Sequence, residues 1–250
     1  MARIGTIHVK RIQYMVDFHS HFLPGIDDGA ADVPTGAEML RESYRQGVRL
    51  MCATPHFYAD EDDPKRFLAR RDEAYHRLRD ALGDEKDIPE IVLGAEVLYF
   101  PGISVADEVR ALAIGDSPFL LIEPPMMPWS ESMLDEIEQC GHSLRCIPVI
   151  AHIDRYMRLL HAPELIDRVR DRRMLIQVNA SFFLYPEYSE RALELFREGQ
   201  IHFIGSDCHD MDRRAPNLGD AEEKIREAGL GKLSDEFHRK IRNILKGKVS

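Results

Sequence analysis

The stretch Asp17-Phe18-His19-Ser20-His21 indicates both the fold and the chemistry of this chain, and it follows the apolar residues Tyr14-Met15-Val16. An apolar lead of this kind predicts a buried strand. Alternate side chains of a strand point the same way, so Asp17, His19 and His21 are expected on one side. Two imidazoles side by side at a strand end are a natural beginning for a metal site.

The same arrangement recurs along the chain. Several further short, apolar, β-branched runs each end in a residue that could bind a metal. Runs of this length, bounded by proline and glycine, are typical of buried parallel strands. The runs are residues 47–55 before His56, 91–95 before Glu96, 119–122 before Glu123, 147–151 before His152, 175–178 before Asn179, and 201–206 before Asp207 and His209.

Helical patterns lie between these runs. Apolar residues at three- and four-residue spacing predict helices over 35–46, 64–82, 105–113, 131–140, 163–173 and 189–198. Alternation of strand and helix predicts an α/β barrel closed by about seven strands, with its active site at the C-terminal strand ends. An open doubly wound sheet is the alternative, but it would concentrate function at one switch point.

Composition limits the classes of function. The chain has 250 residues and a formal net charge of −10, which argues against general nucleic-acid binding. No apolar run approaches the roughly 20 residues that span a bilayer, so no membrane insertion is expected. One barrel domain is expected over 15–250. Residues 1–14 are expected to be an extension, either a disordered one or an overcalled start.

The four cysteines are Cys52, Cys140, Cys146 and Cys208, and reduced thiols in a cytoplasmic protein are expected. Cys52 lies in an apolar run and is expected in the core. Cys208 and Arg214 match the Cys-x5-Arg loop of thiol-based tyrosine phosphatases. However, the intervening residues include no glycine and are partly acidic, and nearby negative charge raises a thiol pKa. The thiol mechanism is therefore disfavoured.

The candidate ligands carry only nitrogen and oxygen. They are too many for one ion and fit two or three ions, which could clamp a phosphoryl group and generate hydroxide at neutral pH. The candidates are His19, His21, Asp28, His56, Glu96, Glu123, His152, Asp207 and His209. The other histidines are expected elsewhere: His76, His161 and His238 on the surface, His142 in a loop, His202 at the opposite end of the barrel, and His8 in the extension.

An ordered set of motifs adds a family resemblance. Residues 17–30, Asp-Phe-His-Ser-His-Phe-Leu-Pro-Gly-Ile-Asp-Asp-Gly-Ala, resemble the opening motif of the polymerase-and-histidinol-phosphatase (PHP) superfamily. More narrowly, the chain resembles the bacterial capsule and exopolysaccharide tyrosine-protein phosphatases of the CpsB/CapC type. The further motifs lie at 53–56, 94–96, 121–124, 151–156, 177–181 and 205–209. The resemblance implies a distorted TIM-like barrel of seven βα units.

The resemblance also implies three metal ions. By position, His19, His21, Glu96 and Asp207 would hold the first, Glu96, Glu123 and His152 the second, and Asp28, His56 and His209 the third. The family's phosphate-binding arginines match Arg155 and Arg214. Cys208 and Asp210 depart from the family pattern, where a small and a neutral residue are common, and this leaves substrate preference open. The metal is expected to be Mn²⁺, with Fe²⁺, Co²⁺ and Zn²⁺ as alternatives.

The function implied is a metal-dependent protein-tyrosine phosphatase, in which a metal-bound hydroxide attacks phosphorus. The substrate implied by the family is the tyrosine-rich tail of a membrane-associated kinase of polysaccharide biosynthesis. Two alternatives stay open. A small-molecule phosphatase, such as one acting on histidinol phosphate, or a phosphodiesterase could use the same residues. A metal-binding scaffold without turnover is disfavoured, because both arginines and all the ligands are present.

Overall fold

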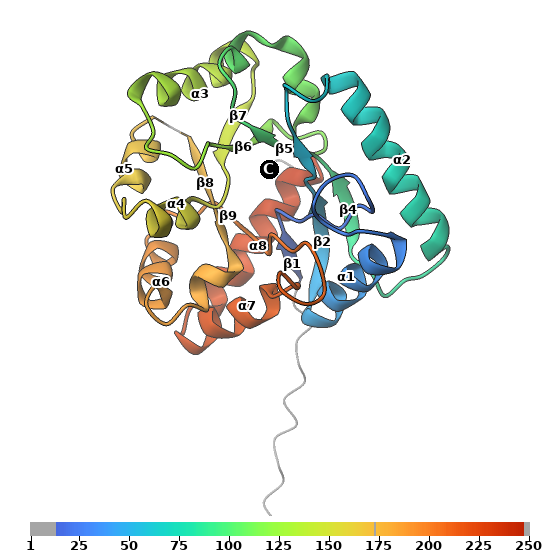
Figure 1. Ribbon diagram of the computed structural model, residues 1–250. Coiled ribbons are helices and arrows are strands. Elements are labelled where there is room, and N and C mark those ends of the chain that lie inside the picture. The colour runs from blue at the N-terminus through green and yellow to red at the C-terminus, as the bar shows by residue number, and fades with distance from the viewer. Residues whose placement is uncertain (1–13, 173, 248–250) are drawn as a thin grey trace, which may run out of the picture.

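A computed structural model describes residues 14–172 and 174–247. Its strands are all parallel to their neighbours and form a curled sheet with helices on the outside (Figure 1). The strands are β1 (Met15–Asp17), β2 (Val48–Ala53), β3 (His56–Phe57), β4 (Glu90–Leu93), β5 (Glu96–Leu98), β6 (Phe119–Glu123), β7 (Ile147–Ile150), β8 (Leu175–Asn179) and β9 (Phe203–Gly205).

Two strands of the barrel are each interrupted. Strands β2 and β3 are the two parts of one, and β4 and β5 are the two parts of its neighbour. β2 pairs with β4 through Ala53 and Leu93, and β3 pairs with β5 through His56 and Glu96, in the same register. The break between β2 and β3 contains Pro55, which has no N–H to donate to a ladder. The described sheet therefore follows seven strand paths, as the sequence predicts.

The first and last strands close the ring. The Phe18 N–H donates to the Ile204 carbonyl at 3.1 Å, and the Asp207 N–H donates to the His19 carbonyl at 2.8 Å. An isolated parallel bridge between Ser20 and Cys208 continues this contact. The expected distorted TIM-like α/β barrel is thus confirmed, and the open doubly wound sheet is excluded.

The described helices are α1 (Val33–Gln46), α2 (Pro64–Leu82), α3 (Glu131–Ser143), α4 (Ile153–Leu159), α5 (Leu165–Arg170), α6 (Ser189–Arg197), α7 (Leu218–Glu227) and α8 (Gly231–Leu245). Asp32, Asp63 and Ser130 cap the first three, because each side chain accepts a backbone N–H in the first turn. The helix expected over 163–173 is shorter, and α4, α7 and α8 were not predicted.

The prediction of an α-helix over 105–113 is wrong. Two 3-10 helices, η1 (Ile103–Val105) and η2 (Asp107–Leu112), occupy this region, and a third, η3 (Ala180–Phe183), follows β8. Ala106, between η1 and η2, has φ −89° and ψ 83°, which no helical turn allows. The apolar spacing over 105–113 fits a buried 3-10 face as well as an α-helical one.

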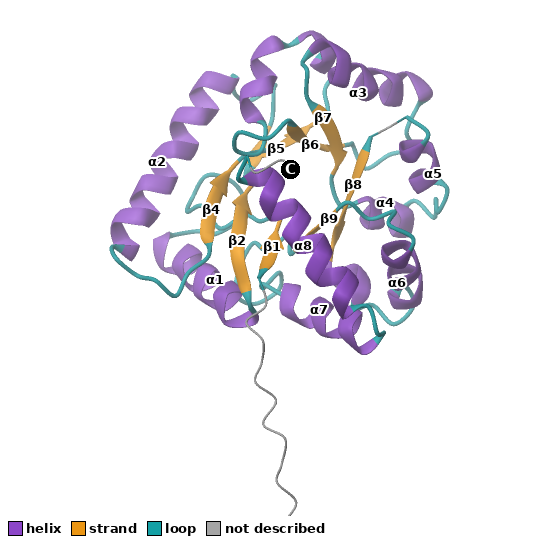
Figure 2. Cartoon of the chain, turned by 180° about the vertical axis from the view of Figure 1, so that it is seen from behind, coloured by secondary structure: helices purple, strands orange, loops and turns teal. Residues whose placement is uncertain are grey.

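Helix α8 fills the end of the barrel opposite the site. Ile241 and Leu245 join the inner core of the barrel, in which the Phe18 ring stacks on Phe203 at 3.8 Å between centroids. Figure 2 shows α8 lying across the ring of strands from behind. His238 is buried and its Nδ1 accepts the Val16 N–H at 3.1 Å, so the predicted surface position of His238 is wrong.

The N-terminal side of the barrel begins at Tyr14, whose ring lies 4.5 Å from the guanidinium carbon of Arg242. Tyr14 thus packs on the barrel and does not belong to a separate extension. Residues 1–13 of the predicted extension lie outside the described residues. No helix in the described part of the chain combines the length and the apolar character that crossing a membrane requires.

Closure of the barrel leaves no room for a side chain at Gly205. A Cβ there would lie 2.4 Å from the His19 Cβ and 2.8 Å from the His19 backbone nitrogen. We expect Gly205→Ala to lower the free energy of unfolding by about 1–3 kcal/mol, the usual cost of overpacking, because β1 must move. Denaturant titration measures this change. Gly141→Ala is the control, since its Cβ would meet nothing closer than 3.5 Å. Equal stability of Gly205→Ala and wild type would contradict the tight closure.

Candidate metal centre

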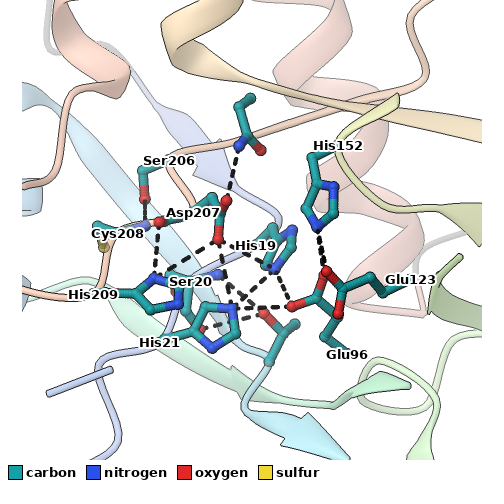
Figure 3. Close-up of polar contacts among 12 residues, drawn as sticks. His19, Ser20, His21, Glu96, Glu123, His152, Ser206, Asp207, Cys208 and His209 are labelled. Atoms are coloured by element: carbon teal, nitrogen blue, oxygen red, sulfur yellow. Dashed lines mark hydrogen bonds and ion pairs between the residues drawn. The ribbon is translucent and has the colours of Figure 1, made fainter. Parts of the chain in front are cut away.

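The nine predicted ligands gather on one face of the barrel. They come from the loops after β1, β7 and β9 and from β3, β5 and β6, and most of them are labelled in Figure 3. Asp28 is the exposed member of the set, with 66% of its side chain accessible. The remaining eight are buried or nearly so. Strand ends far apart in the sequence therefore supply one compact cluster.

The first part of the cluster joins two imidazoles to two carboxylates. The Nε2 atoms of His19 and His21 lie 3.0 Å apart and lie 3.0 and 3.2 Å from Glu96 Oε2. Asp207 Oδ1 lies 3.7 and 3.6 Å from the same two nitrogens. His19, His21 and Asp207 thus offer atoms that lie within 4.8 Å of one another, and Glu96 contacts both imidazoles of this group.

The other oxygen of Glu96 faces a second group. Glu96 Oε1 lies 2.8 Å from His152 Nε2, which lies 3.4 Å from Glu123 Oε1. The carboxylate of Glu96 therefore presents one oxygen to each group. A carboxylate placed in this way would bridge two neighbouring ions if both groups bound metal.

A third group lies on the exposed side. Asp28 Oδ1 lies 3.3 Å from His209 Nε2 and 3.5 Å from His56 Nε2. The other ring nitrogen of His56, Nδ1, lies 3.2 Å from Glu96 Oε2. His56 thus stands between two groups, and by distance alone it could serve either.

Outer contacts fix which ring nitrogen faces the cluster. His21 Nδ1 lies 2.8 Å from Asp27 Oδ2, His19 Nδ1 lies 3.1 Å from Gln177 Oε1, and His209 Nδ1 lies 3.0 Å from the Asp207 carbonyl. Such contacts hold metal-binding imidazoles in one orientation. Asp27 and Gln177 were not predicted. Their only signal in the sequence is their place within the motifs around Asp28 and Asn179.

Opposite charges balance within the cluster. Burial lowers the pKa of His21 and His152, but the carboxylates of Asp27, Glu96 and Glu123 outweigh burial and raise these pKa values to about 10 and about 9. Burial raises the carboxyl pKa of Glu96, yet its histidine neighbours hold it well below the ordinary value. Protons on these histidines would compete with a cation for the same nitrogens.

The residues fit a cluster of divalent ions. Among the described residues, two buried ring nitrogens that face the cluster, His56 Nδ1 and His209 Nε2, make no hydrogen bond. An unpaired buried polar atom is costly, and a metal ion satisfies it. The donors are nitrogen and oxygen only, which suits catalytic rather than structural metal chemistry.

The backbone is strained where two of the ligands sit. His152 has φ 30° and Asp207 has φ 53°, in the left-handed region that non-glycine residues seldom adopt. Strain of this kind persists where surrounding structure imposes it, commonly at functional sites.

Two strand-end residues do not join the ligands. Asp17 Oδ1 accepts the N–H groups of Ser206 at 2.9 Å and His19 at 3.3 Å, so the expectation that Asp17 converges with the two histidines is wrong. Backbone donors occupy this carboxylate, and burial raises its pKa to about 6. Asn179 Nδ2 donates to Asp207 Oδ2 at 2.8 Å and so orients a ligand from outside.

Both candidate arginines converge on the same oxygen. Arg155 Nη2 lies 2.5 Å and Arg214 Nη2 lies 2.7 Å from Asp207 Oδ2, while Oδ1 of that carboxylate faces the histidines. The two side chains are 24% and 37% exposed, so they are partly accessible from solvent. The arginines thus lie beside the candidate metal ligands and have further N–H donors available for an anion.

The barrel, the buried nitrogen and oxygen cluster and the adjoining arginines define a class of metal-dependent hydrolase acting on an anionic substrate. The family model described as capsular polysaccharide synthesis, CpsB/CapC, matches residues 15–244, so the chain belongs to this family. The family resemblance stated from the sequence is confirmed.

Named relatives agree along almost the whole chain. The tyrosine-protein phosphatase CpsB of Streptococcus agalactiae is 28% identical over 251 residues, covering 93% of this chain and 98% of that protein. The tyrosine-protein phosphatase YwqE of Bacillus subtilis is 29% identical over 210 residues, covering 80% of this chain and 79% of that protein.

A solved structure supports the same grouping. It comes from work on YwqE of Bacillus subtilis and CpsB of Streptococcus pneumoniae, described as metal-dependent tyrosine phosphatases. It superposes with a TM-score of 0.81 at 25% identity and covers 94% of this chain and 96% of that one. A dihydropyrimidinase from Brevibacillus agri, at 9% identity and a TM-score of 0.52 over 89% of this chain and 68% of its own, shares the fold alone.

Cys208 is not placed to act as a nucleophile. Its side chain is fully buried, and burial together with Asp17 raises the pKa of the thiol. We expect Cys208→Ser to keep most phosphatase activity, because a buried neutral thiol cannot attack phosphorus. Steady-state kinetics and metal analysis on the same preparation test this. Loss of activity with the metal content intact would favour the thiol mechanism instead.

Proposed function

We propose that this chain is a metal-dependent tyrosine-protein phosphatase that uses a cluster of metal ions. The observation that carries the proposal is the pair of carboxylates at its centre. Glu96 offers one oxygen to each of two histidine groups, and Asp207 offers one oxygen to histidines and the other to two arginines. The names of the relatives support phosphotyrosine as the substrate.

Three ions would be held by the three groups. His19, His21, Glu96 and Asp207 would hold the first, Glu96, Glu123 and His152 the second, and Asp28, His56 and His209 the third. Mn²⁺ is proposed as the metal, and Fe²⁺, Co²⁺ and Zn²⁺ have ligand preferences that this set also meets. Bound ions would supply activation of water and neutralisation of phosphoryl charge.

The protein's own side chains would position the phosphate. Arg155 and Arg214 present planar guanidinium groups, which bind a phosphoryl group through paired N–H donors. Asp207 holds both in place through Oδ2. Preorganised donors of this kind stabilise charge that develops on the phosphoryl oxygens. The leaving phenolate has a pKa near 10 as free phenol, so it departs readily.

The partner proposed is a phosphotyrosine protein, specifically a membrane-associated bacterial tyrosine kinase of polysaccharide biosynthesis. The family's description, capsular polysaccharide synthesis, supports this assignment. A cytoplasmic location beside the membrane is proposed with it, since the kinase tail would lie there.

Metal removal tests the proposal directly. A chelator should abolish hydrolysis of a phosphotyrosine peptide, and Mn²⁺ should restore it. Glu96→Ala and His21→Ala should lower activity and bound metal together, because each removes a ligand atom shared within the cluster. Full activity after exhaustive chelation would contradict the proposal. Faster turnover of histidinol phosphate or of a phosphodiester than of the peptide would favour the alternative substrates.

The arginines have a separate test. Arg155→Ala and Arg214→Ala should each lower kcat/KM by roughly 10²-fold, the usual loss when one preorganised donor is removed. Metal content should stay near that of wild type, because neither side chain is a proposed ligand. Lysine should restore activity only in part, since it lacks the bidentate fork. Near-normal kcat/KM in both variants would contradict a role in phosphate binding and would leave the arginines only their ion pairs with Asp207.

A further inference from the structure

A pocket of about 240 Å³ opens beside the proposed phosphate site. Its walls come from α4, from η3 and the segment that follows, and from the loop between β9 and α7. Four arginines line it: Arg155, Arg158, Arg213 and Arg214. Only Arg155 and Arg214 take part in the proposed phosphate binding. Arg158 and Arg213 have no role in that binding, although they line the same pocket.

The two inner arginines are already paired, but the two outer ones are not. Asp207 accepts from Arg155 and Arg214. Neither Arg158 nor Arg213 has a carboxylate within ion-pair distance among the described residues. The Arg213 backbone N–H donates to Asp210 Oδ1, which shapes the loop and leaves the side chain exposed.

Arg158 is held in position without being neutralised. Its guanidinium carbon lies 4.8 Å from the centroid of the Tyr185 ring, within the range of a cation–π contact. Arg155 and Arg158 are three residues apart on α4, and side chains at this spacing are neighbours on a helix. A group bound by Arg158 would therefore lie next to one bound by Arg155.

The carboxylates that line the pocket do not cancel this charge. They are Asp154 and Asp207. Asp154 is buried, its Oδ1 accepts the Asn179 N–H at 2.9 Å, and it pairs with neither outer arginine. The remaining lining includes Ser181 and Tyr185, which offer hydroxyl groups. The chain as a whole has a net charge of −10, but this pocket is lined by four arginines and therefore favours an anion.

We infer that Arg158 and Arg213 form a second anion subsite, which binds a negatively charged group of the substrate next to the phosphotyrosine being hydrolysed. The inference rests on the proposed function, because Arg155 and Arg214 must hold the reacting phosphate. The group is a carboxylate of a flanking Asp or Glu, or a second phosphate. Arginine binds both through the same planar fork.

Matched peptides test this subsite. One phosphotyrosine peptide carries Glu on both sides of the phosphotyrosine, the second carries Gln there, and the third carries a second phosphotyrosine. The wild-type kcat/KM should be about fivefold higher for the Glu peptide or the doubly phosphorylated peptide than for the Gln peptide, the size expected of a partly exposed charge pair. This ratio should fall toward one in Arg158→Gln combined with Arg213→Gln, and in high salt.

Arg197→Gln is the control, because Arg197 is an exposed arginine of α6, away from the pocket, without an ion pair among the described residues. It should preserve the ratio. A preference for the doubly phosphorylated peptide alone would identify the anion as phosphate. Equal wild-type kcat/KM for all three peptides would overturn the subsite while leaving the proposed phosphatase activity intact. A double variant whose kcat/KM falls by the same factor on all three peptides would overturn the subsite as well. Failure to hydrolyse any peptide would overturn the proposed function itself.

Discussion

Asp207 links the closure of the barrel to the candidate metal cluster and to the two arginines. Its backbone N–H donates to His19 and helps close the barrel, and its φ of 53° turns the side chain into the site. One carboxylate oxygen faces the histidines, and the other accepts from Arg155, Arg214 and Asn179. Barrel closure, the proposed metal binding and the proposed phosphate binding therefore share one residue. A change at Asp207 would disturb all three at once.

The cluster also brings many ionisable side chains together in the interior of the barrel. Several carboxylates and imidazoles are buried at the same place, and burial of unpaired charge is strongly unfavourable. Mutual pairing compensates in part, which is why the pKa of His21 is raised and the pKa of Asp27 is lowered to about 2. The raised pKa values of His21 and His152 favour their protonated rings when no cation is present. Cations would replace those protons, so binding should release protons and weaken as the pH falls.

The sequence could predict the barrel because each strand is a short apolar run that ends in a potential ligand, and the shared edge of a parallel sheet gathers those ends. It could not predict Asp27 or Gln177, because their roles depend on which ring nitrogen they face across the barrel. It also misplaced His238, since the inner face of α8 becomes visible only once the barrel is closed. The prediction for Asp17 was wrong for a related reason, because its carboxylate accepts the backbone N–H of Ser206, just after β9.

Anomalous X-ray diffraction from crystals grown with Mn²⁺ is the sharpest test of the proposed metal cluster, because it locates the ions and their ligands without relying on turnover. We expect ions on both sides of Glu96, one bound by Oε2 together with His19 and His21 and the other bound by Oε1 together with His152. Peaks away from Glu96, or a single ion that leaves one of these histidine groups unused, would contradict a metal cluster centred on Glu96.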